Sequence, residues 1–116
     1  MEIEIVFVGP YNMHNSLAAI QLGEELNKQG KKFVFKPRLT LDAVGRYVKA
    51  KHSSVGMISY FSSFETFKSR GIKVISELNL FINGANRLRL DNGETKDYFI
   101  LSSGNGLIQK FPLSKD

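Results

Sequence analysis

The sequence predicts an α/β fold, a small three-layer domain whose sheet is mostly parallel (βαβαβα) and is followed by C-terminal antiparallel strands. Two observations support this prediction. Short apolar runs alternate three times with segments of helical character in the first part of the chain, which is typical of βα units around a parallel sheet. Alternating strands and turn residues then replace that pattern. With 116 residues we expect one domain over 1–116, right-handed crossovers and a first strand near the centre of the sheet.

The first strand is predicted over residues 2–8, which are mostly apolar and β-branched, as in a strand buried on both faces. Gly9-Pro10 breaks this strand, and a polar segment leads into a helix. Gly30 stands where a left-handed residue would end that helix. The helix places one apolar stripe against the sheet, made of Ala19, Leu22, Gly23 and Leu26.

A second strand is predicted over residues 32–36, ended by Pro37. Thr40 can cap the following helix, and Asp42 suits its first turn. The inward stripe of this helix contains Leu41, Val44, Gly45 and Val48. Because a glycine costs a helix about 1 kcal/mol, we expect Gly45 to pack closely against the sheet.

The third strand is predicted over residues 54–60, and Ser62 and Glu65 match a capping box that opens a short helix ending at Gly71. Residues 72–82 are rich in residues that favour strands, and nearly every second residue is apolar, so that these side chains would line one face. The segment is therefore predicted as a long strand.

The end of the chain predicts hairpins. Arg87 to Leu90 alternates between polar and apolar residues, Asp91-Asn92-Gly93 is a turn signal, and Tyr98 to Leu101 returns as a strand. Gly104-Asn105-Gly106 indicates one more hairpin, into Leu107-Ile108.

Composition limits the chemistry. The net charge of +5 favours anionic partners, and the absence of cysteine excludes disulfides, thiolate nucleophiles and cysteine metal sites. Two histidines without spaced acidic partners, and no phosphate loop or dinucleotide turn, predict no metal and no cofactor. No apolar run approaches the roughly 20 residues of a membrane span. The acidic start, Met1-Glu2-Ile3-Glu4, differs from a signal peptide, so we expect a cytoplasmic protein.

A ligand site is expected where the first strand meets the following helix, because a strand's carboxyl end faces unpaired N–H groups there. His14 falls in the first helical turn, where imidazolium is disfavoured, so a neutral His14 could act as a base or hydrogen-bond donor. It could also be a surface histidine in a capping loop, which is the simpler interpretation. Asn12, Asn15 and Ser16 can cap the helix or bind a carboxylate.

Three further candidates follow later strands. Ser62 and Ser63 could bind a ligand at the third helix, although Ser62 and Glu65 are most simply a capping pair. Arg38 follows the second strand, where it could bind an anion or remain a solvated surface residue.

The order of elements and several short strings resemble the catalytic domain of prephenate dehydratases. The matching strings are Gly9-Pro10 with Ala18-Ala19, Phe35 and Pro37 before Leu41-Asp42-Ala43-Val44 and Val48, Gly56 to Ser63, Ser76 to Ile82, and Asp97 to Leu101. The chain departs from this family in two ways. The second lobe is missing, because a short turn joins Leu90 to Tyr98. Asp97 and Tyr98 replace the family's catalytic Thr-Arg pair, and Met13, Asn15 and Ser16 replace its Thr, Ser and His.

The resemblance implies a lyase-like protein that dehydrates, decarboxylates or only binds an anionic, prephenate-like carboxylic acid at the carboxyl ends of the first and third strands. In an enzyme of this kind, His14 or Asp97 would move the proton, and Asp97 could equally be a solvated strand-end charge. Because one lobe cannot enclose a ligand, we expect a homodimer whose partner subunit covers the cleft.

Two alternatives stay open. The loss of the Thr-Arg pair favours a non-catalytic ligand-sensing or assembly module. Nucleic-acid binding is suggested by the basic balance and by Tyr47, Tyr60 and Phe61. We expect no nucleic-acid partner, because these aromatic residues fit a core and the lysines do not form one stripe.

Overall fold

The computed structural model describes residues 2–59 and 73–104 of the chain. In chain order the elements are β1 (Glu2–Val8), α1 (Met13–Lys28), β2 (Lys32–Arg38), α2 (Leu41–Ala50), β3 (Ser54–Ser59), β4 (Phe81–Arg89) and β5 (Thr95–Ser102). A short helix over residues 73–77 precedes β4. The predicted capping box at Ser62 and Glu65, its helix, and the hairpin from Gly104 into Leu107-Ile108 lie wholly or mostly outside the described residues.

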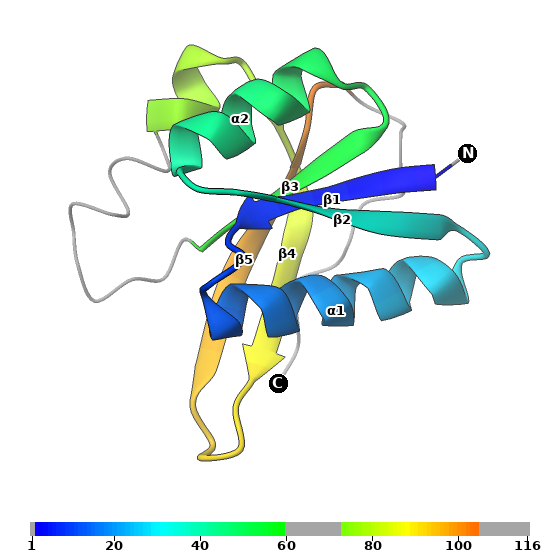
Figure 1. Ribbon diagram of the computed structural model, residues 1–116, viewed down its shortest axis with the longest axis vertical. Helices are drawn as coiled ribbons and strands as arrows, with labels where there is room; N and C mark the ends of the chain where they lie inside the picture. The colour runs from blue at the N-terminus through cyan, green and yellow to red at the C-terminus, as the bar shows by residue number, and fades with distance from the viewer. Residues whose placement is uncertain (1, 60–72, 105–116) are drawn as a thin grey trace.

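The strands of this part of the chain form one mixed sheet in the order β2-β1-β3-β5-β4 (Figure 1). β1 pairs in parallel with β2 and with β3, so the first strand lies inside the sheet, as predicted. β5 is antiparallel to both β3 and β4. The turn between β4 and β5 contains Gly93 at φ 88°, which confirms the hairpin predicted around Asp91-Asn92-Gly93.

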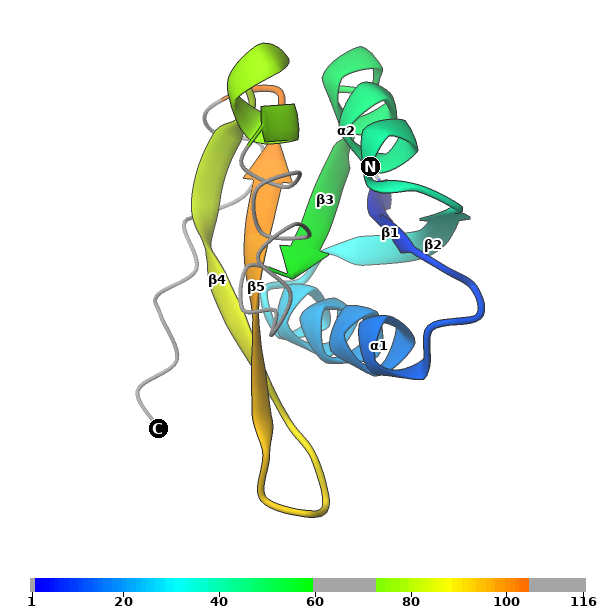
Figure 2. The same cartoon turned by 90° about the vertical axis from the view of Figure 1, so that its left-hand side faces the viewer.

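Helices cover both faces of the sheet, which confirms the three-layer α/β prediction (Figure 2). α1 packs on one face and α2, with the helix over 73–77, on the other. The core beneath α1 comprises Ile3, Ile5, Phe7, Ala18, Ala19, Leu22, Leu26, Val55, Met57, Leu88, Tyr98 and Ile100. The core beneath α2 comprises Val6, Leu41, Val44, Val48, Ile58, Val74, Leu80 and Leu101.

Local side-chain chemistry sets the helix ends. The Thr40 hydroxyl accepts a hydrogen bond from the backbone N–H of Ala43 at 3.1 Å, which confirms Thr40 as the cap of α2. Gly30 has φ 75°, and the N–H groups of Gly30 and Lys31 donate to the carbonyls of Asn27 and Leu26. This is a Schellman ending, and it confirms the predicted role of Gly30.

The long strand predicted over residues 72–82 is wrong. Residues 73–77 are helical, and β4 begins only at Phe81. Asn79 has φ 52°, and the N–H groups of Asn79 and Leu80 donate to the carbonyls of Ser76 and Ile75, so the helix also ends in a Schellman motif. The alternation misled the prediction because Val74 and Leu78 are four residues apart, a spacing that lines one face of a helix as well as of a strand.

Two smaller expectations also need correction. β2 continues through Pro37 to Arg38, because β2 is an edge strand and the proline's missing N–H faces no partner there. The close approach at Gly45 is to the helix over 73–77 and not to the sheet: a Cβ at Gly45 would collide with Val74 and lie 3.0 Å from Leu78 Cδ1. Gly56 on β3 supplies the close contact between sheet and α2, since a Cβ there would lie 2.8 Å from Val48 Cγ2.

Candidate functional site

The predicted site lies where β1 ends and α1 begins. Gly9-Pro10, joined by a cis peptide bond, turns the chain out of β1. The Asn12 side-chain oxygen accepts from the backbone N–H of Asn15 at 3.0 Å, so Asn12 is the residue that caps α1. The first turn of α1 contains no acidic residue, which leaves the positive end of the helix dipole without a neighbouring carboxylate of its own.

Asn15 fastens this turn to the sheet. Its amide nitrogen donates to the Val8 carbonyl at 2.9 Å, and its amide oxygen accepts from the Tyr98 hydroxyl at 3.0 Å. One side chain therefore ties the end of β1, the start of α1 and β5 together. Both polar ends of the amide are used inside the protein, so Asn15 acts as a structural bridge.

Tyr98 completes this bridge from beneath α1. Its side chain is buried in the core, and burial raises the pKa of its phenol to about 12. The phenol therefore stays protonated at neutral pH and acts as the donor to Asn15. The sequence pattern placed Tyr98 on a strand but gave no signal of this long-range hydrogen bond.

His14 and Ser16 share the first turns of α1 with Asn15, and both are half-buried. Within the part of the chain that the structure describes, neither side chain has a hydrogen-bond partner. Asn12, His14, Asn15 and Ser16 are thus the predicted site residues that the fold brings together.

Arg38 lies on the opposite face of the sheet. Its guanidinium carbon is 4.5 Å from the centre of the Tyr47 ring on α2, and its Nη1 donates to the Pro37 carbonyl at 2.8 Å. Arg38 is therefore held on the α2 face by Tyr47, and it does not join His14 in one site.

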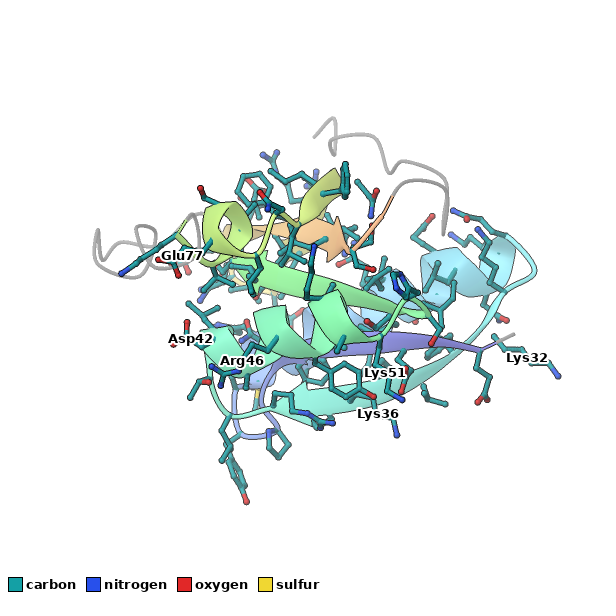
Figure 3. All side chains as sticks on the ribbon, turned by 90° about the horizontal axis from the view of Figure 1, so that it is seen from above. Lys32, Lys36, Asp42, Arg46, Lys51 and Glu77 are labelled. Atoms are coloured by element: carbon teal, nitrogen blue, oxygen red, sulfur yellow. The ribbon has the colours of Figure 1, made fainter. Side chains whose placement is uncertain are left out.

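The Tyr47 hydroxyl in turn donates to Glu4 Oε1 at 2.5 Å. This hydrogen bond is the main reason that the pKa of Glu4 lies below its ordinary value. The positive charges of Lys51 and Lys36, both labelled in Figure 3, lower this pKa further. The same hydrogen bond raises the pKa of Tyr47. Glu4, Tyr47 and Arg38 therefore form a polar network that joins β1, α2 and β2.

Asp97 is paired with the residue directly opposite it on β4. Its two oxygens accept from Arg87 Nε at 2.7 Å and from Arg87 Nη2 at 3.1 Å. The neighbouring Tyr98 points beneath α1, so the alternation of strand side chains directs Asp97 to the α2 face. Asp97 and His14 therefore lie on different faces of the sheet. Ser62 and Ser63 lie outside the described residues.

Exposed apolar side chains gather around this end of α1. Met13, Leu17 and Ile20 lie on its outer face and are 73%, 43% and 46% exposed. Tyr11 precedes the helix, and Leu39 follows β2 at the same edge of the sheet; both are largely exposed. Only the inward stripe of this helix was predicted from the sequence, although the spacing 13, 17, 20 also marks a second apolar stripe.

No model of a known protein family matches the chain, and no curated protein sequence matches it either. Within residues 2–59 and 73–104, no three acidic or histidine side chains come together as metal ligands would. Neither of the long helices described, α1 and α2, has the length and apolar character that crossing a bilayer requires.

Proposed function

We propose that the protein is a non-catalytic assembly module that forms a homodimer through the outer face of α1. The observation that carries this proposal is the apolar stripe of Met13, Leu17 and Ile20 on the solvent side of a helix whose other side already fills the core. Adjacent exposed apolar side chains of this kind mark interaction surfaces. The alternative of catalysis is weakened because Asp97 is held by Arg87 and Arg38 is held on the other face.

The spacing of the stripe suits a second copy of the same helix. Met13, Leu17, Ile20 and Glu24 follow intervals of four, three and four residues, as in the seam of a coiled coil, and all four are exposed. In an antiparallel pair, Leu17 of one copy packs against the partner's Ile20, and the reverse contact occurs on the other side of the twofold axis. Leu17 and Ile20 of both copies then lie together at the centre of the contact.

Charge favours the same arrangement. The antiparallel pairing places Glu24 opposite the partner's Met13, next to the N-terminus of the partner helix. That terminus has no acidic residue in its first turn, and a carboxylate there is stabilised by the helix dipole. A parallel pair would instead place the two Glu24 carboxylates together, where they repel each other. The pattern therefore favours the antiparallel form.

Cross-linking tests this arrangement, because the chain has no cysteine of its own. Ile20→Cys places the introduced thiol close to its copy across the twofold axis, whereas Lys28→Cys, on the same helix, places the two thiols far apart. We expect a short bismaleimide to convert the first variant, and not the second, to covalent dimer. Adding Leu17→Glu to Ile20→Cys should abolish the product. Equal cross-linking of both cysteine variants, or none, would contradict the proposal.

A second candidate function is the binding of a small carboxylic acid at the N-terminus of α1. It is favoured by the apolar Tyr11, Met13 and Leu39 around a helix N-terminus that lacks acidic residues, which suits a carboxylate with an apolar body. This candidate follows the resemblance to prephenate dehydratases. Lyase turnover would then depend on His14, because Arg87 holds Asp97.

The two candidates compete for the same place, since the acid would displace the partner's Glu24. Incubation with prephenate, followed by detection of aromatic products and by equilibrium dialysis, separates them. Turnover abolished by His14→Ala supports the lyase. Saturable binding without turnover, tightened by Glu24→Gln, supports a ligand sensor. If neither occurs while the cross-link forms, the assembly role stands alone.

A further inference from the structure

A separate cavity of about 350 Å³ lies on the α2 face of the sheet, between α2 and the helix over 73–77. Six described residues line it: Asp42, Arg46, Lys73, Val74, Glu77 and Leu78. It is separated by the sheet from the outer face of α1, so it is independent of the proposed dimer contact.

Gly45 is the reason that the two helices meet here. Without a side chain at Gly45, Val74 and Leu78 approach the backbone of α2 directly. Val74 is buried and Leu78 is half-buried in the core beneath α2, so the floor of the cavity is apolar. The charged residues stand around this floor, on the exposed sides of both helices.

Each wall of the cavity carries one acid and one base. Asp42 and Arg46 come from α2, and Lys73 and Glu77 come from the second helix; Figure 3 labels Asp42, Arg46 and Glu77 at this end of the molecule. Lys73 and Glu77 form an exposed ion pair at 3.8 Å, of the kind that contributes little stability. Among the described residues, Asp42 and Arg46 have no side-chain partner.

We infer that this cavity binds a zwitterion, specifically a free α-amino acid with an apolar side chain. An anion alone would face two carboxylates, and a cation alone would face two cations, whereas an amino acid satisfies both signs. Its ammonium group pairs with Asp42 and Glu77, and its carboxylate suits the planar guanidinium of Arg46. Its side chain rests on Val74 and Leu78. The volume stands near the lower end of small-molecule sites, which fits a single amino acid.

Titration of ¹⁵N-labelled protein with L-leucine, L-valine and L-methionine tests this inference. We expect saturable shift changes confined to α2 and residues 73–78, with a Kd on the order of 1 mM for at least one of them. Two probes keep the apolar body of leucine but lose one charge: 4-methylpentanoate lacks the ammonium group and 3-methylbutylamine lacks the carboxylate. Both should bind about tenfold more weakly or not at all.

Matched variants complete the test. Arg46→Gln and Asp42→Asn should each weaken amino-acid binding about tenfold, while Lys49→Gln, on the same helix but outside the cavity, should leave it unchanged. Circular dichroism checks that each variant is folded, and the comparison of singly charged probes needs no variant. The inference is overturned if none of the three amino acids saturates, or if a singly charged probe binds as tightly as leucine.

Discussion

Tyr98 joins three parts of the molecule through one side chain: it belongs to β5, packs beneath α1 and donates to Asn15 at the start of α1. Tyr98→Phe should cost about 1 kcal/mol at neutral pH, because the Asn15 oxygen loses its donor. The folded-state pKa of about 12 lies above the ordinary value of 10.0, so Tyr98 stabilises the fold fully below pH 10 and loses that contribution as pH rises toward 12. Ionisation of the phenol at still higher pH should lower the free energy of unfolding by up to about 3 kcal/mol, more than the hydrogen bond alone, because the folded protein must then hold a buried phenolate.

Urea unfolding at a series of alkaline pH values measures this effect. The wild-type protein should lose stability more steeply than Tyr98→Phe as the pH rises from 10 toward 12, because the variant has no phenol at this position. Lysine deprotonation affects both proteins alike and cancels in the comparison. Parallel stability curves over this range would mean that the phenol is not held neutral by burial.

Gly45 is the second residue at which the surroundings allow the effect of a substitution on stability to be predicted. In an exposed helix, Gly→Ala stabilises by about 1 kcal/mol. At Gly45 the added methyl group would collide with Val74 and crowd Leu78, and overpacking of this kind costs about 1–3 kcal/mol. We therefore expect Gly45→Ala to destabilise the protein in urea unfolding. Lys49→Ala, exposed on the same helix, should change stability little, and a stabilising Gly45→Ala would refute the close approach.

At the scale of the elements, the helix over 73–77 ends at Asn79, although the alternating pattern of residues 72–82 predicts a strand there. Asn79 adopts φ 52°, a left-handed conformation that costs most residues about 1–2 kcal/mol but suits asparagine and glycine. Asn79→Ala should therefore lose about 1 kcal/mol of unfolding free energy, while Asn79→Gly should be close to neutral. Ser76→Ala, exposed in the same turn, serves as the control. Equal effects of the alanine and glycine variants at position 79 would contradict the helix ending.

The elements that the sequence could predict are those in which the hydrophobic periodicity and the capping residues agree. β1, α1 and α2 carry periodicity and caps that agree, as at Asn12, Thr40 and Gly30, and they were predicted correctly. Residues 72–82 carry a period-two pattern whose apolar members also fit one helical face. The contact of Val74 and Leu78 with Gly45, far away in the chain, also favours the helix, and that contact has no local sequence signature.

At the scale of the whole molecule, the predicted site residues lie on two opposite faces of the sheet. The N-terminus of α1 could be located from the sequence, because a strand, a Gly-Pro break and a capping asparagine occur together. The positions of Arg38 and Asp97 could not. Each depends on strand register and on a distant partner, Tyr47 for Arg38 and Arg87 for Asp97, and the alternation of side chains sends both to the α2 face.

The proposed dimer makes a prediction for stability as well as for contact. If folding is coupled to pairing through Leu17 and Ile20, the free energy of unfolding per mole of dimer rises by about 1.4 kcal/mol for each tenfold increase in protein concentration. We expect the thermal midpoint of the wild-type protein to increase across such a series. Leu17→Glu, which places a carboxylate at the centre of the antiparallel contact, should keep the circular dichroism spectrum and remove the dependence. A wild-type midpoint that does not change with concentration would mean that the α1 stripe does not couple two copies during folding.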